Sequence, residues 1–485
     1  MSTTTDISQR ARALFASFKA VVDFAVLFLG QVVTKLAGIA AFAFLARTLT
    51  AEEYGAVETA VSMWMIGFAF VDFGTGATGI RRLSQHPESY AEIVRTVASA
   101  RLMLAAIAVP LLLALYVSLA GDAAPPGLLL LYGLSLFGLV LNQEWLFQAK
   151  ERMDIAAFGP SLRMGAFLVL VILFAPGESG VLSVGYAEAL AAAIMALFFL
   201  ASQAMTFGLG SARLDFRGGL HMIRSASGLG LAKIANAFAS SVPVLIVAAI
   251  AGATEAGDIG AALRIAISII TFSWLYYLNL YPLFARHAAS DREGFVALVE
   301  ASQRFASWTG VVACAVLFVG SKLIMSVVFG ADYADVSLEF EVLVVAIFFT
   351  FASGTARWTL IAQERNRAIF RVQLWGAVVT AIVALGGAIT HGALGGAVGY
   401  TVGVAAVWSV AHLASQRESL APTSLRHFFL PTALGVAVCA GVRISGLADL
   451  PAMILTGAIL GAAALADPRM RRAMFHLAAS KSGDA

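Results

Sequence analysis

The sequence predicts an all-α polytopic membrane protein with about fourteen transmembrane helices. First, 60% of its 485 residues are hydrophobic and 13% are charged, whereas proteins average roughly 45–50% apolar and about 25% charged residues. Second, the charges gather in clusters between apolar runs of about 20 residues, the length that crosses a hydrocarbon core roughly 30 Å thick. Third, the runs lack the alternating pattern of a membrane β-barrel, so helices are the structure that can satisfy its own backbone there.

Fourteen apolar segments follow one another along the chain. They cover approximately residues 20–46, 55–79, 99–120, 127–149, 155–175, 181–207, 228–251, 259–285, 306–329, 337–361, 372–389, 394–414, 427–445 and 450–466. The connections alternate between a short neutral or acidic set and a basic set, and 27 of the 32 Lys and Arg residues belong to the basic side. Cytoplasmic loops of membrane proteins are enriched in Lys and Arg, so both termini are expected in the cytoplasm.

Two short strings repeat between the halves of the chain. Residues 145–152 read W-L-F-Q-A-K-E-R, and residues 358–365 read W-T-L-I-A-Q-E-R, 213 residues later. The second half begins six spans after the first. Because six is an even number, both halves enter the membrane in the same direction. The repeat is therefore parallel, and it predicts two six-helix lobes related by a pseudo-twofold axis along the membrane normal.

This repeat divides the chain into five expected parts. They are a cytoplasmic N-terminal tail (1–19), an N-lobe (20–210), a C-lobe (211–416), two extra helices (417–470) and a cytoplasmic tail (471–485).

Five basic residues are not explained by this topology. They are Lys35, Arg47, Arg264, Lys322 and Arg443. A charge inside a membrane helix is costly and usually faces a cavity or a partner, so such residues are candidates for function. Lys35 falls near the middle of the first span, where it would face an aqueous cavity or pair with a buried carboxylate. Arg47 is either an interfacial anchor or a substrate contact, and Arg264 either faces the cavity or snorkels; Lys35, Arg47 and Arg264 are the candidate substrate-binding residues.

Asp72 is the candidate residue for ion coupling. It lies in the inner third of the second span, ahead of Arg81 and Arg82. A carboxylate embedded in a membrane can bind a proton or sodium ion, and equally it can pair with a basic residue at the cytoplasmic end of the helix bundle. Glu188 and Glu341, near the outer ends of their spans, are expected at the interface.

The sequence offers no support for an enzyme. Cys314 and Cys439 both lie in apolar segments, which does not indicate a disulfide framework. We find neither a metal-binding spacing of His, Cys and carboxylate residues nor a Ser-His-Asp pattern, so no catalytic residue, metal or cofactor is expected. Because the basic residues follow the membrane topology, the net charge of +3 does not indicate nucleic-acid binding.

Three motifs in the first third of the chain resemble a known family. Residues 46–55 (A-R-T-L-T-A-E-E-Y-G), 72–83 (D-F-G-T-G-A-T-G-I-R-R-L) and 145–153 (W-L-F-Q-A-K-E-R-M) are similar to the ends of spans 1, 2 and 4 in polysaccharide flippases. These flippases belong to the multidrug/oligosaccharidyl-lipid/polysaccharide exporter superfamily. The third motif departs from the family pattern W-x-F-Q-G-x-E-x-M at Ala149, which keeps a small residue in place of Gly.

The resemblance implies a flippase that moves an undecaprenyl-pyrophosphate-linked oligosaccharide across the bacterial inner membrane by alternating access. Its expected roles are in lipopolysaccharide or exopolysaccharide biosynthesis, with a proton or sodium gradient as the energy source. The expected partners are the lipid-linked oligosaccharide, the bilayer, and polysaccharide polymerase and chain-length proteins.

Two alternatives stay open. One is a cation-coupled multidrug or lipid II exporter of the same superfamily. The other is a membrane polysaccharide polymerase or ligase, which is disfavoured because such enzymes need a large, charged outer loop.

Overall fold

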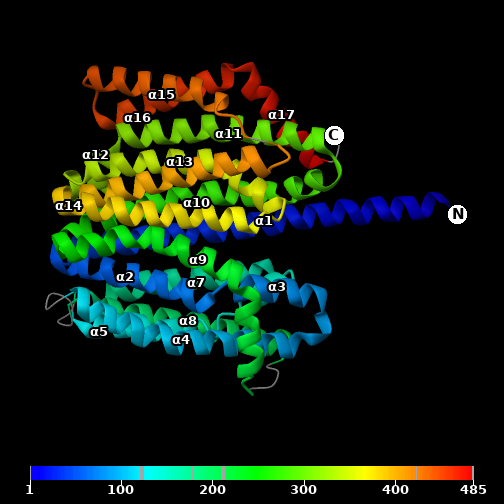
Figure 1. Cartoon of the computed structure of the whole chain (residues 1–485), viewed down its shortest axis with the longest axis horizontal. Helices are drawn as coiled ribbons and strands as arrows, with labels where there is room; N and C mark the ends of the chain where they lie inside the picture. The colour runs from blue at the N-terminus through cyan, green and yellow to red at the C-terminus, as the bar shows by residue number, and fades with distance from the viewer. Residues whose placement is uncertain (1, 121–124, 177–179, 209–212, 422, 483–485) are drawn as a thin grey trace. The chain divides into compact units, whose positions relative to one another are not determined.

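The protein is helical throughout the part of the chain that the structure describes. This structure is a computed structural model, and it describes residues 2–482 except 121–124, 177–179, 209–212 and 422. The helices, shown in Figure 1, are α1 (Ser2–Thr48), α2 (Ala51–Asp72), α3 (Thr75–Gln85), η1 (Pro87–Ser89), α4 (Tyr90–Ala120), α5 (Pro126–Gly138), α6 (Glu144–Ala149), α7 (Met153–Phe174), α8 (Leu182–Thr206), α9 (Phe216–Ala251), α10 (Ala253–Ser290), α11 (Arg292–Val319), α12 (Ser321–Phe329), η3 (Ala331–Ala334), α13 (Ser337–Ala362), α14 (Asn366–Glu418), α15 (Arg426–Ile444), α16 (Asp449–Ala466) and α17 (Pro468–Ser482).

The chain forms two compact units. The first comprises residues 1–41, 67–113 and 127–230, and the second comprises residues 42–66, 114–126 and 231–485. In the first unit α7 packs on α8 and α3 packs on α6. In the second unit α13 packs against α10, α11 and α14, while α15, α16 and α17 pack on α11.

Within the described residues, twelve helical segments are long and apolar enough to cross a membrane. The longest of them, α14, consists of two helices that meet at a kink, where His391 and Gly392 leave helical geometry. This kink lies between the predicted spans 372–389 and 394–414. The carboxylate of Glu255 accepts a hydrogen bond from the Ala393 backbone N–H at 2.8 Å, which caps the second of the two helices.

Two of the predicted spans in the N-terminal half of the chain are interrupted, and a third, over 306–329, breaks at Gly320 between α11 and α12. The span expected over 55–79 breaks after Asp72, because Phe73 and Gly74 take positive φ angles of 39° and 71° before α3 begins. The span expected over 127–149 breaks between α5 and α6, where the Asn142 side chain accepts a hydrogen bond from the Glu144 N–H at 3.0 Å. Hydropathy alone does not register such breaks, because Phe73 in the first and Leu139 to Leu141 in the second are as apolar as the helices around them.

Both predicted tails are helical where the structure describes them. Residues 2–19 belong to α1, and residues 471–482 belong to α17. Met470, Ala473 and Leu477 of α17 are buried, and Ala473 and Leu477 share a core cluster with Phe295 of α11. The predicted connections 121–127 and 176–180, and residues 1 and 483–485 of the tails, lie partly or wholly outside the described residues.

The two repeated strings adopt the same local structure. Glu151 and Glu364 occupy equivalent positions and both have left-handed backbone angles, with φ of 55° and 57°. The next N–H in each string, of Arg152 or Arg365, reaches back five residues to the carbonyl of Phe147 at 2.8 Å or of Leu360 at 2.9 Å. This is the geometry in which many helices end.

Candidate functional site

Several charged side chains inside the described spans are held in ion pairs. Arg101 pairs with Asp72, Arg163 pairs with Glu188, and Arg264 pairs with Glu58. Breaking such a pair leaves an uncompensated charge in a medium of low polarity, so each of these pairs is a strong local constraint.

Arg101 joins the two interrupted spans of the N-terminal half. Its guanidinium lies 2.6 Å from an Asp72 carboxylate oxygen and 3.1 Å from the Thr75 hydroxyl, on either side of the first break. It also donates to the carbonyls of Leu139 and Asn142, at 3.1 and 2.7 Å, in the second break. Asp72 therefore pairs with a basic residue, which is one of the two alternatives that the sequence left open. The pair has a structural role, because it holds the two breaks together.

Arg264 is half-buried and pairs with a carboxylate. Its guanidinium makes three contacts of 2.7–3.0 Å with the Glu58 carboxylate and lies 3.1 Å from the centre of the Phe42 ring. The Tyr54 hydroxyl donates to the same carboxylate at 2.8 Å. This cluster joins α2 to α10 and includes the tyrosine of the Y-G motif at residues 54–55.

The glycine of that motif is required by close packing. A Cβ atom on Gly55 would lie 1.7 Å from the backbone oxygen of Ala253 at the start of α10. No side chain fits at that distance, so the motif residues hold α2 and α10 together.

Arg47 and Lys35 occupy different environments. Arg47 is exposed at the end of α1 and donates to the Val327 carbonyl at 2.5 Å. Arg47 and Arg264 belong to the second unit, and Lys35 belongs to the first unit, where it is half-buried on α1.

Glu188, which the sequence predicts at the interface, is buried within the first unit. Glu188 is 4% exposed and lies 2.5 Å from Arg163 of α7. Trp145 is 3% exposed and packs in a core cluster with Leu83 and Met222. Glu341 pairs with Arg443 and accepts a hydrogen bond from Ser321 at 2.8 Å.

The second unit contains a cavity of about 250 Å³ in which Arg357 is the charged side chain. The cavity is lined by one residue of α2 and by residues of α9, α10, α13 and α14; the polar and aromatic ones are Asn236, Ser240, Ser273, Trp274, Tyr277, Thr350, Arg357, Trp358, Gln373, Thr380 and Tyr400. Its lining includes no carboxylate.

The aromatic side of this cavity is fixed by hydrogen bonds. Tyr277 is 1% exposed, and its hydroxyl contacts the Phe351 carbonyl at 3.0 Å and the Thr355 hydroxyl at 2.9 Å. A Cβ atom on Gly354 would lie 1.9 Å from the Tyr277 ring, so the glycine makes room for that ring. Tyr277 and Tyr400 both lie close enough to Arg357 to interact with it electrostatically.

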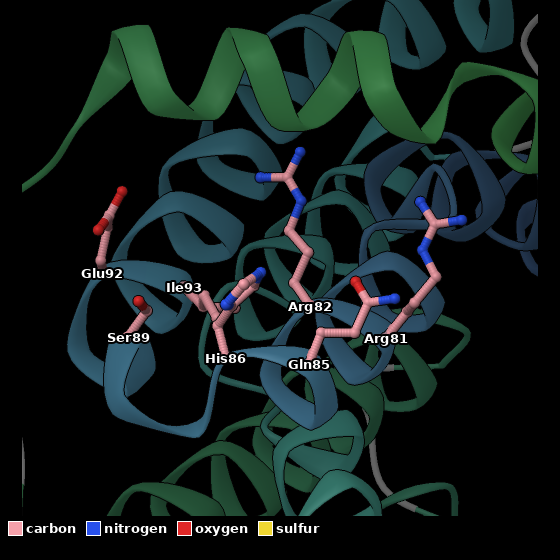
Figure 2. Close-up of a pocket in the computed structure, with 7 residues that line it drawn as sticks. All are labelled: Arg81, Arg82, Gln85, His86, Ser89, Glu92 and Ile93. Carbon is pink, nitrogen blue, oxygen red and sulfur yellow. The ribbon is translucent and has the colours of Figure 1, made fainter.

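A second, open pocket of about 430 Å³ lies in the first unit at the end of α3 (Figure 2). Figure 2 shows Arg81, Arg82 and Gln85 on one wall, with His86 and Ser89 beside them. The Arg82 guanidinium donates to the Ser225 hydroxyl at 2.9 Å, and the His86 ring lies 3.4 Å from the exposed Glu88. The two arginines make this pocket suited to an anionic group.

Sequence reasoning missed Arg357, Arg101 and Arg163, because it assigned all three to the cytoplasmic basic set. They lie inside α13, α4 and α7 respectively, and Arg101 is 4% exposed. The repeat carried a signal for Arg357: at the 213-residue offset it corresponds to Glu144, so the equivalent positions carry opposite charges.

Comparison with known proteins gives a consistent family. The family model described as "Polysaccharide biosynthesis protein" matches residues 20–287. A curated protein of Escherichia coli (strain K12), "Putative O-antigen transporter", is 22% identical over 302 residues, which cover 60% of this chain and 71% of that protein.

Solved structures with the same fold come from two groups of transporters. "Lipid II flippase MurJ, inward closed conformation" aligns with a TM-score of 0.65 at 11% identity and covers 91% of this chain and 98% of its own. An inward-facing multidrug resistance MATE family transporter of the MOP superfamily aligns with a TM-score of 0.59 at 16% identity, over 87% of this chain and 100% of its own. At these identities the likeness is one of fold.

Proposed function

The chain belongs to the polysaccharide biosynthesis protein family, and we propose that it flips an undecaprenyl-pyrophosphate-linked oligosaccharide across the bacterial inner membrane for surface polysaccharide synthesis. The family is one of multi-pass membrane transporters of polysaccharide biosynthesis and not of enzymes. The observation that carries the proposal is the family match over residues 20–287, which contains Lys35, Arg81 and Arg82. The relative named as an O-antigen transporter supports the same class of cargo.

The proposed architecture has fourteen spans, with two six-helix lobes (20–210 and 211–416) related by an axis along the membrane normal. Three observations support it: the kink that divides α14, the shorter apolar helix α5, and the shared geometry at Glu151 and Glu364. Two further helices follow over 417–470, and both tails (1–19 and 471–485) are cytoplasmic, because the basic residues lie on that side.

In this scheme the pocket at Arg81, Arg82 and His86 faces the cytoplasm and receives the pyrophosphate head before translocation. Lys35 is the proposed contact inside the membrane, because a half-buried lysine in the first span can bind an anion that is leaving water. Arg47 is the proposed contact at the outer end. Arg264 could contact substrate only if its ion pair with Glu58 opened.

Charged and sugar groups cannot cross hydrocarbon unaided, because each unpaired polar group costs several kcal/mol there. A protein passage that opens alternately to the two sides removes this cost, while the lipid tail stays in the bilayer. We further propose that a proton or sodium gradient drives the cycle, and that polysaccharide polymerase and chain-length proteins act on the delivered product.

The proposal is tested in a strain that lacks the chromosomal copy of this chain. We expect the deletion to abolish surface polysaccharide and to cause lipid-linked oligosaccharide to accumulate. Complementation with Lys35→Ala should lower surface polysaccharide by about tenfold, Lys35→Arg should restore most of it, and Lys322→Ala, which changes an exposed lysine, should behave as wild type.

Two results would count against this scheme. A deletion strain with normal surface polysaccharide and no accumulated lipid-linked oligosaccharide would refute the flippase function. Normal polysaccharide from Lys35→Ala at normal protein level would remove Lys35 from the substrate path and leave the function standing.

A further inference from the structure

We infer that the cavity around Arg357 in the second unit is an oxyanion-binding site for a phosphate or pyrophosphate group. The site lies inside one unit, so it is defined by α2, α9, α10, α13 and α14 of that unit alone. The inference stands on the cavity itself. Only the identification of the bound group with the pyrophosphate of the lipid-linked cargo rests on the proposed function.

The first argument is the missing counter-charge. Arg101, Arg163 and Arg264 each face a carboxylate at 2.5–2.7 Å. Arg357 also lies within a membrane-spanning helix, yet within the part of the chain that the structure describes it forms no hydrogen bond and no ion pair. A cation at such a place requires compensation, which an anion in the adjoining cavity would supply.

The second argument is the chemistry of the walls. Beside Arg357 the cavity presents the amides of Asn236 and Gln373 and the hydroxyl of Tyr400. These groups donate hydrogen bonds without adding charge, and guanidinium matches the geometry of phosphate oxygens. A cavity with one cation, neutral donors and no carboxylate among its lining residues favours an anion and repels a cationic ligand.

The third argument is size. A volume of about 250 Å³ lies just below the range of roughly 300–1,000 Å³ that is usual for small-molecule sites. This space suits one or two phosphate groups, and it is too small for a lipid-linked oligosaccharide. The remainder of any lipid-linked ligand would therefore lie outside the cavity.

The test is isothermal titration of the purified full-length protein in detergent with inorganic pyrophosphate. We expect saturable binding to the wild type, binding weaker by about tenfold or more to Arg357→Gln, and an intermediate affinity for Arg357→Lys, which keeps the charge but loses the planar fork. The matched control is Arg152→Gln, which removes an exposed arginine outside the cavity and should leave this binding unchanged.

Folding is monitored separately by thermal unfolding without ligand, and pyrophosphate should raise the midpoint of the wild type but not that of Arg357→Gln. Unchanged affinity of a folded Arg357→Gln variant, or no binding by the wild type, would overturn the inference. If Arg357→Gln does not fold, an affinity of Arg357→Lys equal to that of wild type would count against it, and a weakened affinity would support it.

A second arm separates the two sources of the ligand. Vesicles that contain undecaprenyl pyrophosphate should compete with inorganic pyrophosphate if the lipid head group occupies the site, and a failure to compete would assign the site to the free anion. If pyrophosphate binding depends on Arg357 but deletion of the protein leaves polysaccharide export normal, the proposed function is refuted and the site stands. If the wild-type protein supports export but binds no pyrophosphate, the site is refuted and the proposed function stands.

Discussion

At the scale of single residues, Arg101 shows how one buried cation stabilises a broken helix. A break frees backbone carbonyls that have no water to bond with inside a membrane. Arg101 provides donors for the Leu139 and Asn142 carbonyls and neutralises Asp72 with the same guanidinium. Its side chain is 5% exposed, so none of these bonds competes with bulk water.

We predict that Arg101→Met lowers the free energy of unfolding by about 3–5 kcal/mol, the usual cost of leaving one partner of a buried pair uncompensated. Thermal unfolding in detergent measures the change. The control is Arg152→Met, because Arg152 pairs with Asp154 on the surface and its loss should have little effect. Equal midpoints for the two variants would show that Arg101 has no special structural role.

At the scale of helices, two features determine how neighbouring helices meet: the residue that ends a helix, and the glycine at a close contact between helices. Glu151 and Glu364 end equivalent helices with left-handed backbone angles, which is uncommon for a residue with a side chain. The two repeated strings therefore end their helices with the same backbone geometry. Their tryptophans, however, lie in different environments. Trp145 is buried in a core cluster, whereas Trp358 borders the Arg357 cavity.

The contact between α2 and α10 supplies the prediction at this scale. Gly55→Ala would place a methyl group 1.7 Å from the Ala253 backbone oxygen, so the helices must separate and stability should fall by about 1–3 kcal/mol. Gly165→Ala in α7 is the matched control: no atom lies within 4 Å of its new Cβ, and removing a helical glycine should raise stability by roughly 0.5–1 kcal/mol. Thermal midpoints that move in the same direction would contradict the packing argument.

At the scale of the whole molecule, composition and charge pattern predicted the class of fold because they follow directly from the thickness and low polarity of the bilayer. The same reasoning located the division of α14 near Gly392. It could not locate the breaks at Asp72 and between α5 and α6, since these depend on Arg101, which is distant in sequence. It also could not separate Arg357 from the loop arginines. Counting charges assigns each residue to one side of the membrane but does not say how far inside a helix the residue lies.

The pairing of Asp72 leads to a prediction for the transport cycle. Asp72→Asn keeps an oxygen that can accept the hydrogen bond from Arg101 but removes the group that could bind a proton or sodium ion. If Asp72 acts as a structural anchor, transport by this variant should keep its full dependence on the ion gradient, at a protein level close to that of wild type. The measurement is export of lipid-linked oligosaccharide in vesicles with and without an imposed gradient, with Asp154→Asn as a surface control. Export that no longer responds to the gradient in Asp72→Asn alone would instead make Asp72 the coupling residue, and its pair with Arg101 would then have to open in each cycle.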